Sequence, residues 1–210
     1  MKLKKSVRKK LIILLVIVVA ILGVFFLKDV IFKKNTDVKE VKIVSKIEKY
    51  GYNLKENKPK AYKKMFEELE KILEAKEVKE EDYVKKIAEM FVFDFYSLDD
   101  KTAKTDVGGV EFVHKDALEN FLDNAQDTYY KYVENNIYDN RKQTLPIVEK
   151  VTVNSVEKKA FAYGDKTDEN AYEVKVSWDY TNSKYAKYQK TATLVFVHDD
   201  IKLSLVELQK

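Results

Sequence analysis

The spacing of hydrophobic positions changes twice along the chain, so three stretches predict three kinds of structure. Residues 11–27 read LIILLVIVVAILGVFFL, an apolar run without a charge. Between residues 60 and 136, apolar positions recur three and four apart, which is typical of amphipathic helices. After Pro146 they alternate with polar positions, as in a strand with one buried face. We therefore expect an apolar segment, then helices, then a sheet.

The apolar run predicts a membrane anchor. Its 17 residues would form a helix of roughly 26 Å, just long enough for a bilayer core. Six basic residues precede it, which indicates a cytoplasmic N-terminus. We predict a basic cytoplasmic tail over residues 1–10, a transmembrane anchor over 11–32, a linker with a possible short strand over 33–58, and an extracytoplasmic domain over 59–210. A cleaved signal peptide and a buried core helix are the alternatives.

The helical periodicity predicts three helices, over residues 60–76, 80–96 and 115–136. Each has one apolar face, and the central one also begins with acidic residues that suit a helix N-terminus. The stretch before them, residues 38–54, alternates weakly and predicts a short strand that closes at Gly51. The apolar faces are interpreted as core packing.

The alternating region predicts antiparallel strands. Residues 171–181 place a row of large apolar side chains on one face: Tyr172, Val174, Val176, Trp178 and Tyr180. Residues 188–198 end in a stretch that is apolar on both faces, as expected of a central strand under a helix. A turn at residues 198–200 should join it to a last strand as a hairpin. Helices followed by an antiparallel sheet define an α+β fold with the helices on one face.

The distribution of charge argues against nucleic-acid binding. The formal net charge is +4, but residues 1–34 alone carry nine basic residues and one acidic residue, so the rest of the chain has a net charge of −4. A nucleic-acid surface needs clustered positive charge on the folded domain itself. The chain also has no cysteine, which excludes disulfides and thiolate metal sites.

Asp94 is the most notable acidic residue, because it lies between aromatic residues in FVFDFY. Burial would raise the pKa of its carboxyl group and make it a candidate general acid or base. Tyr172, Trp178 and Tyr180 could line a pocket with it. These four residues form a candidate ligand-binding pocket. The alternative is that Asp94 lies at a helix edge and that the aromatic residues belong to the core.

A second candidate surface is an acidic ridge on the third predicted helix, opposite its apolar stripe. It comprises Asp116, Glu119, Asp123 and Asp127, with Glu134 further along. Such a ridge is either a solvated face or a docking surface for a basic partner. The two histidines, His114 and His198, lack the spacing of a metal site, and GDKTDEN at residues 164–170 lacks EF-hand spacing. We therefore expect no metal and no cofactor.

The order of elements resembles the cystatin-like fold of the nuclear transport factor two superfamily, a curved sheet wrapped around helices. With a short basic tail and one membrane span, it is similar to the bitopic assembly subunits of type IV secretion and conjugation machines. The segments DVGGVEFV (106–113), YKYVENN (130–136) and AYEVKVSW (171–178) also look like uncharacterised single-span proteins of low-GC Gram-positive bacteria. The resemblance implies a fold and a location rather than an activity.

The leading functional hypothesis is a single-pass membrane protein of the bacterial cell envelope, with its C-terminal domain outside the cell. Its partners would be the lipid bilayer, through residues 11–27, and an envelope protein that the domain binds as an interaction or assembly module, without catalysis. Two alternatives stay open. One is a small-molecule-binding ectodomain that uses a cavity of the curved sheet, and the other is an acid/base enzyme centred on Asp94.

Overall fold

The computed structural model describes residues 41–209. The predicted tail and anchor, residues 1–32, lie outside this range. Among the helices of residues 41–209, none combines the length and the apolar character that crossing a bilayer requires.

The unit begins with a hairpin of two strands, β1 (Ile43–Ile47) and β2 (Tyr52–Lys55), joined by the 3₁₀ turn η1 (Glu48–Tyr50). Gly51 closes the turn with a positive φ of 67°. The hairpin packs into the core, because Tyr50, Tyr52 and Leu54 are buried. A short strand is thus present as predicted, but it ends at Ile47, and a second strand follows Gly51. Residues 41–58 belong to the same folded unit as the rest.

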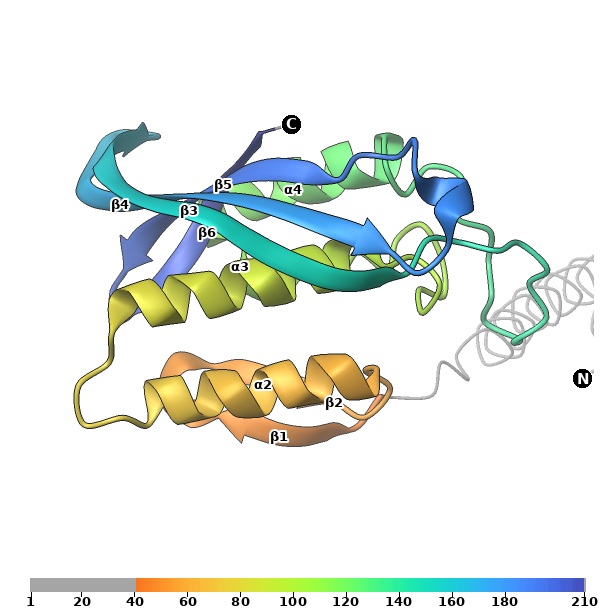
Figure 1. The fold of residues 1–210 in the computed structure, drawn as a ribbon, viewed down its shortest axis with the longest axis horizontal. Coiled ribbons are helices and arrows are strands. Elements are labelled where there is room, and N and C mark those ends of the chain that lie inside the picture. The colour runs from red at the N-terminus through yellow and green to blue at the C-terminus, as the bar shows by residue number, and fades with distance from the viewer. Residues whose placement is uncertain (1–40, 210) are drawn as a thin grey trace, which may run out of the picture. The chain divides into compact units, whose positions relative to one another are not determined.

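Helices α2 (Lys60–Leu73) and α3 (Glu80–Tyr96) follow, and α3 lies between α2 and the main sheet (Figure 1). Pro59 precedes α2, where its missing N–H costs nothing. Helix α2 buries one stripe, whereas every residue of α3 from Met90 to Tyr96 is buried. A helix that is apolar on all sides belongs in the middle of a domain.

The last helix, α4 (Lys115–Asp127), is shorter than the predicted 115–136. The apolar periodicity continues past Asp127, but the backbone leaves the helix at Thr128. Tyr130, just beyond, donates a hydrogen bond to the Phe95 carbonyl oxygen at 2.7 Å and accepts one from the Gly108 N–H at 3.0 Å. These contacts with distant segments hold the chain in an irregular path, so the apolar residues after Asp127 are core residues without being helical.

Four antiparallel strands complete the α+β fold: β3 (Val148–Tyr163), β4 (Lys166–Tyr180), β5 (Thr191–Asp199) and β6 (Lys202–Gln209). Their spatial order is β3-β4-β5-β6, so β3 and β6 are the edges. The predicted buried face of β4 is confirmed from Tyr172 to Tyr180, as is burial on both faces of β5. The predicted hairpin between the last two strands is also confirmed, with Asp200 at a positive φ of 54° in its turn.

Residues 164–170 form a tight turn at Gly164 and the start of β4. Strand β3 likewise continues through the charged residues that interrupt its pattern. Its pairing with β4 shifts register at three places, and such bulges bend a strand. The bent β3–β4 ribbon curls past α3 (Figure 1).

The loop between α3 and α4 packs directly on the backbone of α3 at Gly108. A Cβ atom at this position would lie 2.2 Å from the carbonyl oxygen of Asp94. Because the opposing atom belongs to a helix backbone, it cannot move aside without displacing the helix.

We predict that Gly108→Ala lowers the free energy of unfolding by about 1–3 kcal/mol. The measurement is urea unfolding of the full-length chain in detergent micelles, followed by the fluorescence of Trp178, the single tryptophan. The control is Gly51→Asn, at a left-handed position with no heavy atom within 4 Å. Asparagine tolerates this backbone conformation, so the control should lose less than about 1 kcal/mol. Equal losses in the two variants would contradict the packing argument.

Candidate binding cleft

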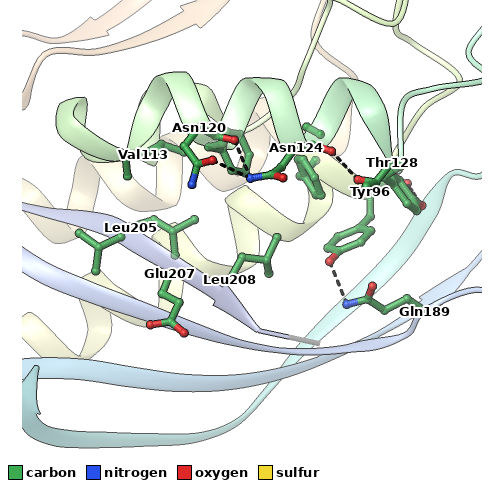
Figure 2. Close-up of a pocket in the computed structure, with 15 residues that line it drawn as sticks. Tyr96, Val113, Asn120, Asn124, Thr128, Gln189, Leu205, Glu207 and Leu208 are labelled. Atoms are coloured by element: carbon green, nitrogen blue, oxygen red, sulfur yellow. Dashed lines mark hydrogen bonds between the residues drawn. The ribbon is translucent and has the colours of Figure 1, made fainter. Parts of the chain in front are cut away.

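A cleft of about 690 Å³ lies between α4, the end of α3 and strand β6 (Figure 2). Its apolar lining residues include Phe95, Phe121 and Leu205. Its polar groups are amides, hydroxyls and one carboxylate, from Asn120, Asn124, Thr128, Gln189, Tyr96, Tyr129 and Glu207. A largely apolar cavity with a few placed polar groups is the usual form of a ligand site.

Helix α4 forms one wall of the cleft. Phe121 anchors it, with ring centroids 5.9 Å from Phe91 and 5.3 Å from Phe95 on α3. Asn120 and Asn124 stand one turn apart and line the cleft. The Asn124 amide donates to both the carbonyl and the side-chain oxygen of Asn120, each at 2.9 Å (Figure 2). This wall therefore presents an exposed pair of amide side chains next to buried aromatic rings.

The inner end of the cleft is built from tyrosines. The Gln189 amide donates to the Tyr96 hydroxyl at 3.0 Å (Figure 2), and the hydroxyls of Tyr129 and Tyr180 lie 3.1 Å apart. Burial raises the pKa of Tyr96, Tyr129 and Tyr180 above the ordinary value of a phenol. These hydroxyls therefore stay protonated at neutral pH and can serve as neutral hydrogen-bonding groups.

Trp178 lies behind this end of the cleft, with its ring centroid 4.1 Å from that of Tyr96. Its indole N–H is buried and has no hydrogen-bond partner among residues 41–209. Of the four residues predicted to line one pocket, Trp178 and Tyr180 thus support the inner end without lining the cleft. Tyr172 and Asp94 lie in two other clusters.

Asp94 is buried in an ionic cluster. Its Oδ1 accepts from the ammonium groups of Lys58 at 2.5 Å and Lys101 at 2.8 Å, and its Oδ2 accepts from the Gly109 N–H at 2.8 Å. Burial alone would raise the pKa of Asp94, but the charges of Lys101 and Lys58 outweigh it and hold the pKa well below the ordinary value. The expectation that burial would raise the pKa of Asp94 is therefore wrong in direction. The sequence around Asp94 does not indicate which lysines approach its carboxylate.

Tyr172 belongs to a polar network at the N-terminus of α3. Its hydroxyl donates to Glu80 at 2.7 Å, and Lys158 lies 3.1 Å from the same carboxylate. His198 bridges Glu80, at 3.3 Å, and Asp168, at 2.8 Å. The hydrogen bond from Tyr172 is the main cause of a lowered pKa of Glu80. This network ties α3 to strands β3, β4 and β5.

The acidic ridge predicted on α4 is exposed at each of its four positions: Asp116, Glu119, Asp123 and Asp127. It borders the wall of the cleft, since the lining residues Asn120 and Asn124 each follow one of these acids. His114 accepts a hydrogen bond from the Asp116 N–H and so caps α4. Within residues 41–209, no three His, Cys, Asp or Glu side chains are placed to hold a metal ion.

Sequence reasoning missed the cleft residues themselves. Asn120 and Asn124 lie between the apolar stripe and the acidic ridge, and an amide pair one turn apart was the only local signal. Gln189 and Glu207 join them only through the fold. No family model matches the chain, and neither a curated protein nor a solved structure is similar enough to match it.

We predict that Asp94→Asn destabilises the protein by about 3–5 kcal/mol, because it leaves the buried Lys101 beside a neutral amide. The measurement is the same urea unfolding of the full-length chain. Asp179→Asn is the control, since Asp179 pairs with Lys190 on the surface and should contribute little. A loss no larger than that of the control would show that the cluster does not stabilise the fold.

The same cluster predicts an acid dependence of stability. The pKa of Asp94 is lowered in the folded state, whereas the pKa of an aspartate in an unfolded chain is about 3.9. Its stabilisation is therefore present above the unfolded pKa and is lost as the pH falls through the folded pKa. Unfolding at a series of pH values below about 5 should show a steeper decline in wild type than in Asp94→Asn. Parallel curves would contradict the assignment.

Proposed function

We propose that the protein is a membrane-anchored, extracytoplasmic binding module of the bacterial cell envelope, and that it works without catalysis. The observation that carries the binding role is the cleft between α4 and β6, which presents apolar surface and amides at a sheet edge. The anchor and orientation rest on the apolar run at residues 11–27 and the basic residues before it.

The titratable groups support binding rather than acid/base chemistry. Both carboxylate oxygens of Asp94 are engaged by Lys58, Lys101 and Gly109, and Asp94 does not line the cleft. The tyrosines at the inner end have raised pKa values, so they stay protonated and are weak proton donors. What the cleft offers is shape, apolar surface and neutral hydrogen bonds.

We further propose that the domain has a cystatin-like fold. Support comes from the order of elements, helices before an antiparallel sheet, and from the bulges that bend β3 against β4. Within such a fold the concave side of the sheet faces helices, and the cleft beside β6 would open at its rim. This likeness concerns architecture and assigns no partner.

A second candidate is the binding of a small molecule in the same cleft. It is favoured by a volume of about 690 Å³, which falls in the usual range of such sites, and by the hydroxyl and amide groups of Tyr96 and Gln189 at the inner end. Native mass spectrometry of the full-length protein released from micelles separates the two. A retained small molecule, lost on Asn124→Trp, would favour the second candidate.

The binding role predicts that a protein partner contacts the cleft in intact cells. A photo-crosslinking amino acid placed at Asn120 or Leu208 should give a discrete crosslinked band that the same residue at Lys150 does not give. Lys150 is an exposed position on β3, at the opposite edge of the sheet. Bands from neither cleft position, or from all three positions alike, would argue against a protein-binding cleft.

The proposed topology predicts a specific protease pattern. Protease added to intact protoplasts should digest the chain beyond residue 32, and an epitope tag before residue 1 should be spared until the membrane is permeabilised. Full protection of the folded domain in sealed protoplasts would overturn the orientation.

A further inference from the structure

Strand β6 is an edge strand whose outer side is only partly occupied. At Leu205 the outer side pairs with the segment before α4: Val113 forms a parallel bridge to Leu205, and the His114 N–H donates to the Leu205 carbonyl at 2.8 Å. The Leu203 N–H meets the Tyr83 hydroxyl at 3.3 Å. Within residues 41–209, no other segment pairs with the outer side of β6 after Leu205.

This unpaired part of the strand faces the cleft, because Val206, Glu207 and Leu208 are among the lining residues. Figure 2 shows Leu205, Glu207 and Leu208 on the strand opposite α4, which carries Asn120 and Asn124. An unpaired strand edge is a template for another strand, and proteins usually cover it or bind a segment there. A helix facing the edge across a cleft leaves room for a bound strand between them.

The lining suits an extended peptide better than a compact ligand. Side chains of a strand alternate between two sides, so one set can enter the apolar base at Phe95 and Phe121. The amides of Asn120 and Asn124 lie across the cleft from β6, where they can pair with the peptide's second edge. The free part of β6, residues 206–209, is four residues long, a span of about 13 Å.

The charge around the cleft selects among such peptides. Glu207 lines the cleft, and the acidic ridge on α4 borders it with exposed carboxylates. Within α4 the only basic residue is Lys115, at its start. An acidic border favours basic side chains in the bound segment and disfavours acidic ones.

We propose that the cleft binds an extended segment of a partner protein, with alternating apolar and basic side chains, as an additional strand beside β6. This inference rests on the proposed binding function and names its ligand class. Main-chain hydrogen bonds to β6 provide affinity, the apolar base accepts one set of side chains, and the carboxylates select the charge of the other set.

The test uses the full-length protein in detergent micelles and the fluorescein-labelled peptide acetyl-VKVKVK-amide, with binding followed by fluorescence anisotropy. Acetyl-VEVEVE-amide is the charge control, and it should bind at least tenfold more weakly. Two further peptides carry N-methyl groups on all valine amides or on all lysine amides. Since the N–H groups of alternate residues point to opposite edges of a strand, one of these two should lose binding.

Variants of the protein test the location. Asn124→Trp, at an exposed lining position, should fill the cleft and weaken binding of the lysine peptide at least tenfold. Gln126→Trp is the matched control, because it lies on the same helix and does not line the cleft. Glu207→Lys should reverse the preference between the lysine and glutamate peptides.

Four results would overturn the inference. Unchanged binding of both N-methylated peptides would mean recognition without strand pairing. Concentration-dependent dimers in analytical ultracentrifugation, disrupted by Asn124→Trp, would mean that a second copy occupies the cleft. No peptide binding at all, while crosslinks from Asn120 and Leu208 persist, would reject the strand mode and leave the proposed function intact. If neither the crosslinks nor any peptide binding were found, the strand-binding inference and the proposed function would be rejected together.

Discussion

The buried carboxylate of Asp94 is the interaction on which the rest of the structure depends. It joins α3 to two other segments: Lys58 before α2, and the loop after α3 through Lys101 and Gly109. Gly108, in the same loop, also packs against the backbone of Asp94. The loop is therefore held against α3 both by the ionic interactions and by close packing. Replacing a whole buried ion pair by apolar residues often costs no stability. Removing only one partner is strongly destabilising, because the other charge stays buried without compensation.

The position of the cleft follows from this cluster. Gly109 leads directly into η2 (Val110–Phe112) and then into Val113 and His114, which pair with Leu205 on β6. Helix α4 starts immediately afterwards, so this pairing places its N-terminal end beside β6. Tyr130, bonded to Phe95 and Gly108, holds the other end of α4. Both ends of α4 are thus positioned by the loop between α3 and α4 and by α3 itself.

This arrangement separates stability from binding. The polar groups that are buried and charged, Asp94 and Lys101, are saturated by one another and by Asp100. The polar groups that line the cleft are neutral amides and hydroxyls or the partly exposed Glu207. A cleft of that kind can exchange its hydrogen bonds with water for those with a ligand at little cost, because none of its groups balances a buried charge.

Local patterns predicted the helices and strands well where burial follows a single period. The alternation in β4 and the two apolar faces of β5 correctly indicated their burial, since side chains of a strand must alternate. The third helix was predicted nine residues too long, to residue 136 instead of Asp127. Tyr129 keeps the helical spacing, but its hydroxyl contacts Tyr96 on α3 and Tyr180 on β4. The hydroxyl of the next residue, Tyr130, bonds to α3 and to the loop at Gly108.

The four residues of the candidate pocket do not lie together, for a related reason. Asp94, Tyr172, Trp178 and Tyr180 were grouped by chemistry, yet the fold places them in an ionic cluster, a surface network and the support of the cleft. Lys58 and Lys101 carried no local signal in a chain with 39 lysines and arginines, so neither the ionic cluster nor the lowered pKa was foreseeable.

The sequence by itself determined the α+β class, the order of helices and strands, and the charge asymmetry between the first 34 residues and the rest. These depend on composition and on periods of two and 3.6, which are local properties. Only the tertiary structure decided which lysines neutralise Asp94, where α4 ends, and that α4 faces the open edge of β6. Those features depend on contacts between residues far apart in the chain, and hydrophobic periodicity carries no information about such pairs.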